Sequence, residues 1–186
     1  MKVLVACEFS GIVRDAFIAR GHTAVSCDLV PSERPGPHYQ GDVRDLITDD
    51  WDMLIAHPPC TYLSRVSMCR PNPDWAKVRV ATDFVLSLWE APIARIAIEN
   101  PVGRLNKLWQ LPTQMIQPWA FGDPWTKKTC LWLKNLPSLM ATACVQPNGS
   151  WVNAGKGSKG VAMHAKDRSR TFPGIALAMA DQWGVL

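Results

Sequence analysis

The fold of this chain is decided by the stretch Met53-Leu54-Ile55-Ala56-His57-Pro58-Pro59-Cys60, in which a short apolar run ends in a cysteine. A second apolar run, residues 93–98, ends in Glu99-Asn100-Pro101. Each run predicts a buried strand with a reactive side chain just past its carboxyl end. Ligands of open parallel sheets bind at that edge, so we expect a cysteine nucleophile with an acid partner there. The alternative is a buried structural cysteine and a surface glutamate.

Outward from this stretch, short apolar runs alternate with helical patterns along most of the chain. Strands are predicted at residues 3–7, 23–27, 52–56, 93–98, 115–119 and 129–133, and helices at 12–19, 75–90 and 173–183. The Pro- and Gly-rich stretch 31–41 predicts a loop. This alternation is typical of an α/β fold with a doubly wound, mostly parallel sheet, and we expect one domain spanning residues 1–186.

The composition agrees with a globular protein. Of the 186 residues, 47% are hydrophobic and 19% are charged, and no stretch approaches the roughly 20 apolar residues of a membrane helix. The six cysteines form no CxxC pair and no cluster at zinc spacing, so we expect reduced thiols, a cytoplasmic location and no bound metal. The net charge of +4 permits a polyanionic partner without requiring one.

The N-terminal part has the order of a nucleotide-binding unit: a strand, the turn Phe9-Ser10-Gly11, a helix, and a strand that ends at Asp28. Asp28 follows Gly11 at close to the spacing of about 20 residues typical of a ribose-binding acid. The turn lacks the repeated glycines that cradle a pyrophosphate, so a nucleoside-like cofactor such as S-adenosylmethionine fits better than a dinucleotide. Asp42 either accepts a hydrogen bond from an adenine amino group or caps a short helix.

Taken together, these stretches resemble the cytosine-5 DNA methyltransferases. Pro58-Pro59-Cys60 looks like the catalytic Pro-Pro-Cys of that family, and Glu99-Asn100-Pro101 looks like its Glu-Asn-Val. Phe9-Ser10-Gly11 is similar to its first cofactor motif, while Asp28 and Asp42 stand where its ribose-binding and adenine-contacting acids fall. The match covers residues 3 to about 134, and residues 170–183 weakly resemble the family's last motif.

The resemblance implies a class I S-adenosylmethionine-dependent methyltransferase fold, S-adenosylmethionine as cofactor and cytosine carbon 5 in DNA as the methyl acceptor. A thiolate that adds to carbon 6 makes carbon 5 nucleophilic, and a glutamate, if protonated, donates to the ring as negative charge develops. The implied catalytic residues are Cys60, Glu99, Asn100 and Lys127. The implied cofactor-binding residues are Phe9, Ser10, Gly11, Asp28, Asp42 and Pro58.

The chain departs from the family pattern in three places. The first cofactor motif lacks its later glycines, and Lys127 and Thr129 stand where two arginines are expected. A basic, glycine-rich loop near residues 148–170 replaces a large target-recognition domain, so a protein partner could supply recognition. The expected contacts to nucleic acid are Lys128, Lys156, Lys159, His164, Lys166, Arg168 and Arg170.

Two further functions stay open from the sequence. The same chemistry on a free pyrimidine nucleotide or on RNA would suit a chain without a recognition domain. A non-catalytic nucleic-acid-binding module of methyltransferase fold would suit the reduced glycine motif, although such a module has no need of Cys60 and Glu99. A modified methyl donor is a variant of the first function.

Overall fold

The computed structural model describes residues 1–151 and 165–186 and contains one seven-stranded sheet in the order β3-β2-β1-β4-β5-β7-β6. The strands are β1 (Lys2–Ala6), β2 (Thr23–Asp28), β3 (His38–Gln40), β4 (Met53–Ala56), β5 (Arg95–Pro101), β6 (Gln114–Ile116) and β7 (Thr129–Lys134). The α-helices are α1 (Ile12–Ile18), α2 (Arg65–Met68), α3 (Trp75–Trp89), α4 (Leu105–Leu108), α5 (Ala165–Ser169) and α6 (Pro173–Trp183). Two 3-10 turns, η1 (Val43–Asp45) and η2 (Pro118–Ala120), complete the elements.

The sheet is mostly parallel and doubly wound, which confirms the predicted α/β class. Strands β3, β2, β1, β4 and β5 run parallel, and β7 pairs antiparallel with both β5 and β6. The strand order reverses between β1 and β4, and the crevice at such a switch point is where Rossmann-like sheets bind ligands. The loops that follow β1 and β4 are therefore the place to look for a site.

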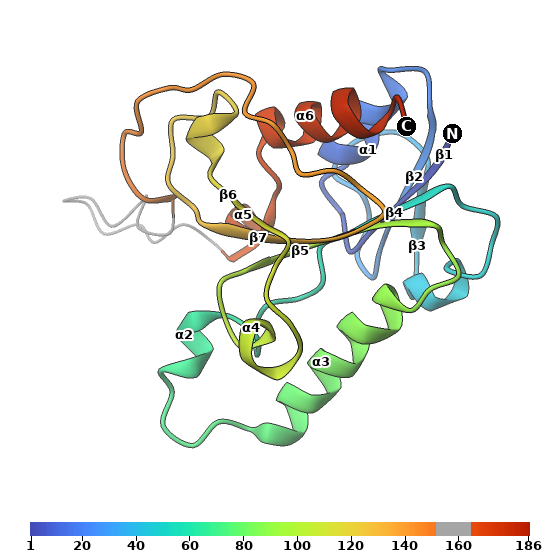
Figure 1. Ribbon diagram of the computed structural model, residues 1–186. Helices are drawn as coiled ribbons and strands as arrows, with labels where there is room; N and C mark the ends of the chain where they lie inside the picture. The colour runs from blue at the N-terminus through green and yellow to red at the C-terminus, as the bar shows by residue number, and fades with distance from the viewer. Residues whose placement is uncertain (152–164) are drawn as a thin grey trace.

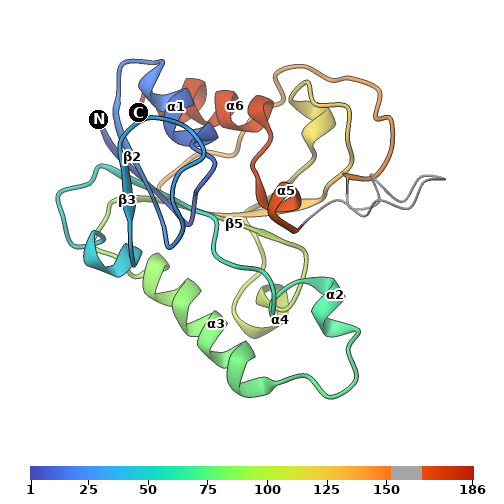
Figure 2. The same ribbon diagram turned by 180° about the vertical axis from the view of Figure 1, so that it is seen from behind.

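Helices cover both faces of the sheet (Figures 1 and 2). Helices α1 and α6 lie together on one face, and α3 lies on the other with α2 and α4 near its N-terminal end. Alternate residues of β4 serve the two layers: Met53 and Ile55 pack with the α1 and α6 side, whereas Leu54 and Ala56 pack with the α3 side. Because both faces are covered, β4 is apolar at every position, as is typical of buried parallel strands.

Two predicted strand ends change in the structure, and one strand lies where a loop is predicted. Strand β5 continues through Glu99 and Asn100 to Pro101, because β7 pairs with it along that length. Both residues therefore lie inside the strand and not just past its end. Strand β3 lies inside the stretch 31–41 that the sequence predicts as a loop, and β6 ends at Ile116 because η2 begins at Pro118.

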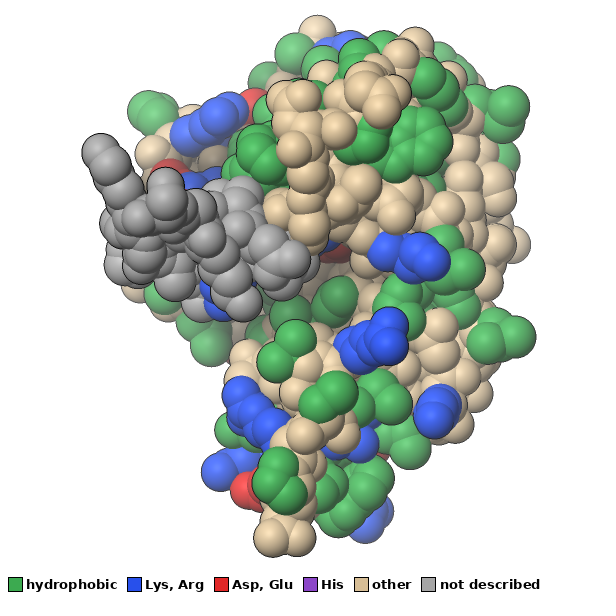
Figure 3. Space-filling model, turned by 90° about the vertical axis from the view of Figure 1, so that its left-hand side faces the viewer, with side chains coloured by type: hydrophobic (Ala, Val, Ile, Leu, Met, Phe, Trp, Pro, Cys, Tyr) green, Lys and Arg blue, Asp and Glu red, His purple; other side chains and the backbone are tan. Residues whose placement is uncertain are grey.

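The surface is hollowed between the lobe formed by α2, α4 and the start of α3 and the rest of the molecule (Figure 3). No helix among the described residues is long and apolar enough to cross a membrane.

Candidate functional site

The candidate nucleophile, Cys60, lies on the loop after β4 and is solvent-exposed. Its carbonyl oxygen accepts hydrogen bonds from the backbone N–H groups of Leu63 and Ser64, so Cys60 begins a tight turn. The loop is anchored from the neighbouring strand, because the buried Asn100 donates from Nδ2 to the Pro58 carbonyl at 2.7 Å. The family resemblance implies a catalytic role for Asn100, and in the structure this residue fixes the position of the Pro-Pro-Cys loop.

The candidate acid, Glu99, forms a buried pair with His57. The distance from His57 Nδ1 to Glu99 Oε2 is 2.9 Å, and the side chains are 7% and 15% exposed. A carboxylate can only accept, so the imidazole carries its proton on Nδ1. Thr171 Oγ1 also lies 3.5 Å from this nitrogen. His57 Nε2 is buried without a hydrogen-bond partner among the described residues, which leaves it available to water or to a ligand.

The surroundings of Glu99 hold it ionised. Burial raises the pKa of the carboxyl, but the hydrogen bond from His57 and the positive charge of Lys127 outweigh burial and place the pKa below its ordinary value. In the free protein Glu99 is therefore an anion at neutral pH. A proton that it donates to a bound base must first reach it during the reaction.

The same charge disfavours the Cys60 thiolate. Partial desolvation and the negative charge of Glu99 raise the pKa of the Cys60 thiol, and the charges of Lys127 and Arg168 offset only part of that rise. Cys60 is thus mostly a thiol near neutral pH. Its reactivity must increase when a ligand neutralises or engages Glu99.

Lys127 approaches the site from the start of β7. Its Nζ donates to the Arg168 carbonyl at 3.0 Å and lies 5.7 Å from the centre of the Phe172 ring. Its charge reaches both Glu99 and Cys60, which places it at the site where the sequence expected a catalytic contact. The neighbouring Lys128 is exposed.

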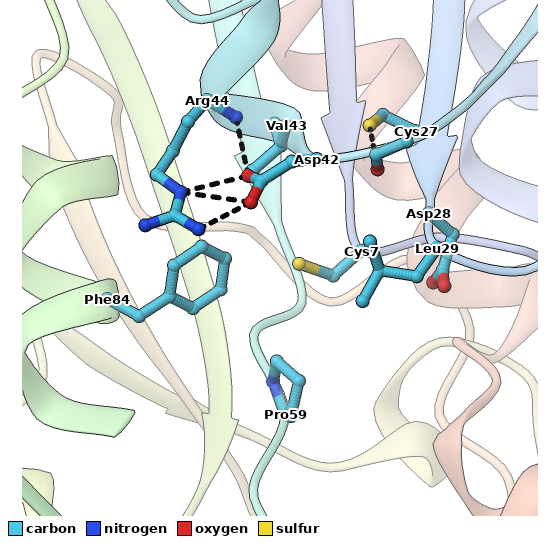
Figure 4. Close-up of a pocket in the computed structure, with 10 residues that line it drawn as sticks. Cys7, Cys27, Asp28, Leu29, Asp42, Val43, Arg44, Pro59 and Phe84 are labelled. Carbon is cyan, nitrogen blue, oxygen red and sulfur yellow. Dashed lines mark hydrogen bonds and ion pairs between the residues drawn. The ribbon is translucent and has the colours of Figure 1, made fainter. Parts of the chain in front are cut away.

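Beside the Pro-Pro-Cys loop lies a cavity of about 210 Å³ at the carboxyl ends of β1, β2 and β4 (Figure 4). The side chains of Cys7, Phe84 and Pro59 face this cavity, and Asp28 lies at its edge. One carboxylate oxygen of Asp28 accepts from the backbone of Val30 at 3.2 Å. Of the two prolines, the exposed Pro59 lines the cavity, whereas Pro58, the predicted cofactor contact, is buried and is not among the lining residues.

Asp42 also lines the cavity, but Arg44 already binds both of its carboxylate oxygens. Its Oδ1 accepts from the Arg44 backbone at 2.9 Å as well, so Asp42 caps η1, as one of the two sequence-based interpretations holds. The hydrogen bonds with Arg44 lower the pKa of Asp42 to about 2. A contact with an adenine amino group would have to share these oxygens with Arg44.

The turn Phe9-Ser10-Gly11 leads from the end of β1 into α1. The residue before this turn, Glu8, makes contacts that the sequence did not predict. The Glu8 carboxylate is 4% exposed and accepts from the backbone N–H groups of Val13 at 2.7 Å and Arg14 at 3.2 Å. It also accepts from the Ser10 hydroxyl at 3.3 Å. A helix N-terminus is the ordinary phosphate site of a dinucleotide fold, and here a carboxylate from the chain fills it. Glu8 therefore occupies the position that a pyrophosphate would take. The lack of repeated glycines in the turn did not predict this contact.

A second cavity, of about 370 Å³, lies on the far side of the same turn. Ile12 at the start of α1, Thr171, and the aromatic side chains of Trp125, Trp151 and Phe172 line it. Trp151 packs edge-on against both other rings, with centroid distances of 5.1 Å.

The predicted basic contacts are only partly described. Lys156, Lys159 and His164 lie outside the described residues, as does the side chain of Lys166. Arg168 lies close enough to Cys60 for its charge to favour the thiolate. Arg170 is engaged in ion pairs with Glu33 and Asp167, so its guanidinium is not freely available to a phosphate.

Several site residues have no motif that predicts them. Cys7 has a φ of 57° directly after β1, and burial together with the charge of Asp28 raises the pKa of its thiol. Phe84 reaches the cavity from α3, and Arg44 reaches it from η1. Of these residues, only Cys7 could have been predicted to line the cavity, because it stands at the end of the first predicted strand. All six cysteines are free thiols, and the described residues contain no cluster of side chains able to hold a metal ion.

Comparison with protein-family models and with curated proteins found no match to this chain.

Proposed function

We propose that this protein transfers a methyl group from S-adenosylmethionine to carbon 5 of cytosine in DNA through a covalent adduct of Cys60. The observation that carries the proposal is that Cys60, on the loop after β4, lies near Glu99 on the adjacent strand β5, next to a cavity edged by Asp28. The two side chains lie close enough that the charge of Glu99 raises the pKa of the thiol. A surface glutamate and an inert buried cysteine would not have this arrangement.

The residues around the first cavity fit the nucleoside part of the cofactor. Asp28 has one carboxylate oxygen without a protein partner in the described structure, and such an oxygen suits a ribose hydroxyl. Phe84 and Pro59 supply apolar walls for a purine. Glu8 at the N-terminus of α1 opposes phosphate, which favours a cofactor without one. When bound, S-adenosylmethionine supplies an electrophilic methyl group on a sulfonium.

The protein's own groups account for the proton movements of the addition. The Cys60 S–H bond breaks, an S–C6 bond forms, and the ring nitrogen gains one proton as the double-bond electrons shift. The Glu99 anion accepts the thiol proton and passes it to the ring nitrogen, so the carboxylate ends as it began. Carbon 5 then takes the methyl group with release of a neutral thioether, and it loses its hydrogen as a proton to solvent. The ring nitrogen returns its proton through Glu99 to the Cys60 sulfur as the S–C6 bond breaks, which restores both the aromatic ring and the thiol.

The remaining residues position this pair. Asn100 donates a hydrogen bond to the Pro58 carbonyl and thereby fixes the position of the loop that carries Cys60. His57 orients Glu99, so that the other carboxylate oxygen can face the exocyclic amine of cytosine. Lys127 stabilises negative charge at both Glu99 and the thiolate. Reduced thiols in a cytoplasmic location would keep Cys60 competent for the addition.

The test is incubation with methyl-labelled S-adenosylmethionine and, separately, single-stranded DNA, duplex DNA, RNA and dCMP. Label should appear in 5-methylcytosine after digestion of DNA. Cys60→Ala should abolish it, whereas the matched control Cys144→Ala, at another exposed free cysteine, should keep wild-type activity. Label confined to RNA or dCMP would replace the substrate in this proposal. Turnover retained in Cys60→Ala would overturn the mechanism.

A further inference from the structure

The segments that follow Cys60 and Glu99 join into one lobe. Ser64 and Gly103 form an isolated antiparallel bridge, and the Arg104 N–H donates to the Leu63 carbonyl at 2.7 Å. Gly103 is needed for this approach, because a Cβ there would lie 1.9 Å from the Leu63 carbonyl oxygen. The lobe of residues 61–80 and 102–108 is therefore fixed to both catalytic strands, and whatever binds it is held next to Cys60.

This lobe is strongly basic. Its single acid is Asp74, against six cations: Arg65, Arg70, Lys77, Arg79, Arg104 and Lys107. Lys77 pairs with Asp74, and Arg79 pairs with Asp83. Arg65, Arg70 and Lys107 are exposed and have no ion pair within the described parts of the chain. Figure 3 shows Lys and Arg side chains interspersed with hydrophobic ones over this part of the surface.

The lobe also presents an aromatic platform. Trp75, the first residue of α3, is 58% exposed, and the Arg104 guanidinium lies 5.0 Å from its ring centre. Arg104 is only 7% exposed and donates to the Ser67 carbonyl at 3.0 Å, so the cation beside the indole is held in place. Nearby, Lys77 Nζ lies 5.9 Å from the centre of the Tyr62 ring. An exposed indole leaves a large apolar surface in contact with water. With a cation held beside it, such a ring suits stacking against a planar ring of a ligand.

We infer that this lobe binds single-stranded nucleic acid and leads it to Cys60. The binding surface, here called the basic face, consists of Arg65, Arg70, Trp75, Arg104 and Lys107. Phosphates contact the exposed cations while an unpaired base stacks on Trp75, which is how sequence-tolerant single-strand binding works. A single strand offers its bases for stacking and spares the cost of flipping a base from a duplex. The inference rests on the proposed function only for the base held at Cys60.

The test measures fluorescence anisotropy of a labelled single-stranded oligo(dC) with the full chain at several salt concentrations. Arg65→Ala with Arg70→Ala should weaken binding at least tenfold and reduce the slope of log K against log salt by about 1.4, the value for two single-strand phosphate contacts. Trp75→Ala should weaken binding roughly tenfold without changing the slope, and Trp75→Phe should retain most of the affinity.

The matched charge control is Lys2→Ala with Arg20→Ala, since both exposed cations lie toward the opposite edge of the sheet, where β1 begins. Circular dichroism checks that each variant is folded. Equal losses in this control, unchanged affinity in the Arg65 and Arg70 variant, or tighter binding to duplex or to phosphatidylserine vesicles would overturn the inference. Binding lost in these variants without any methyl transfer in the wild type would keep the inference and reject the proposed function.

Discussion

At the scale of single residues, the charge on Glu99 sets the state of Cys60. Glu99→Gln removes that charge while keeping the side-chain shape, so the pKa of the Cys60 thiol should fall. We expect alkylation of Cys60 by iodoacetamide at pH 7.5 to become severalfold faster, even though methyl transfer is lost. Peptide mass spectrometry follows each cysteine separately, with Cys69 as the internal control. An unchanged or slower rate at Cys60 would show that Glu99 does not control the thiol.

The hydrogen bond from His57 to Glu99 should make the unfolding free energy depend on pH in a defined direction. A carboxyl whose folded pKa is lowered contributes stability above its unfolded pKa of about 4.3 and loses it as the pH falls through the folded value. His57→Ala removes the hydrogen bond and leaves a buried carboxylate, so unfolding free energy should drop by about 1–3 kcal/mol at pH 7 and by less near pH 3. Urea denaturation at both pH values measures this.

The control for that experiment is His57→Asn, because the asparagine amide places an N–H donor near the position of imidazole Nδ1. It should recover most of the stability at pH 7. If Asn and Ala lose equally at both pH values, packing and not the hydrogen bond to Glu99 explains the role of His57.

At the scale of elements, the N-terminus of α1 depends on one carboxylate. Glu8→Ala leaves the N–H groups of Val13 and Arg14 without their partner in a buried place, so it should cost about 1–3 kcal/mol of unfolding free energy. Chemical denaturation measures the loss. Glu90→Ala, at the exposed end of α3, is the matched control and should stay within about 0.5 kcal/mol of the wild type. A neutral Glu8→Ala would remove the capping role.

The elements also show what local sequence can and cannot predict. The apolar run of β4 and the repeat of α6 are local signals, and the structure contains both elements where the sequence predicts them. The end of β5 is not local, because its last residues are extended by pairing with β7, thirty residues farther along the chain. Strand β3 is hidden among prolines and glycines for the same reason, since its pairing partner is β2.

The candidate site follows the same division. Cys60, Glu99 and Asp28 could be predicted as candidates because each comes at or shortly after the end of an apolar run in the sequence. The pairing of His57 with Glu99 and the filling of the helix N-terminus by Glu8 could not, because they are three-dimensional contacts between residues without a shared motif. The charge of Arg170 predicted a phosphate contact, and the sequence alone did not show that the fold pairs this residue with Glu33.

At the scale of the whole molecule, one side combines the Cys60 loop, strand β5 with Glu99, the first cavity and the basic face. The switch point between β1 and β4 brings the cavity and the Cys60 loop together, and the interlocked segments after Cys60 and Glu99 build the lobe beside them. The proposed nucleic-acid path therefore runs over α2, α4 and the start of α3.

The most direct test of the central claim is to trap the adduct with a single-stranded oligonucleotide that carries 5-fluorocytosine. Fluorine cannot leave carbon 5 as a proton does, so Cys60 cannot be expelled after methyl transfer. With S-adenosylmethionine, the account predicts a denaturation-resistant complex that carries one added methyl group and is linked through Cys60. The complex should form in Cys144→Ala and be absent in Cys60→Ala. No complex with an oligonucleotide that the wild type binds, or a linkage through another cysteine, would contradict the account.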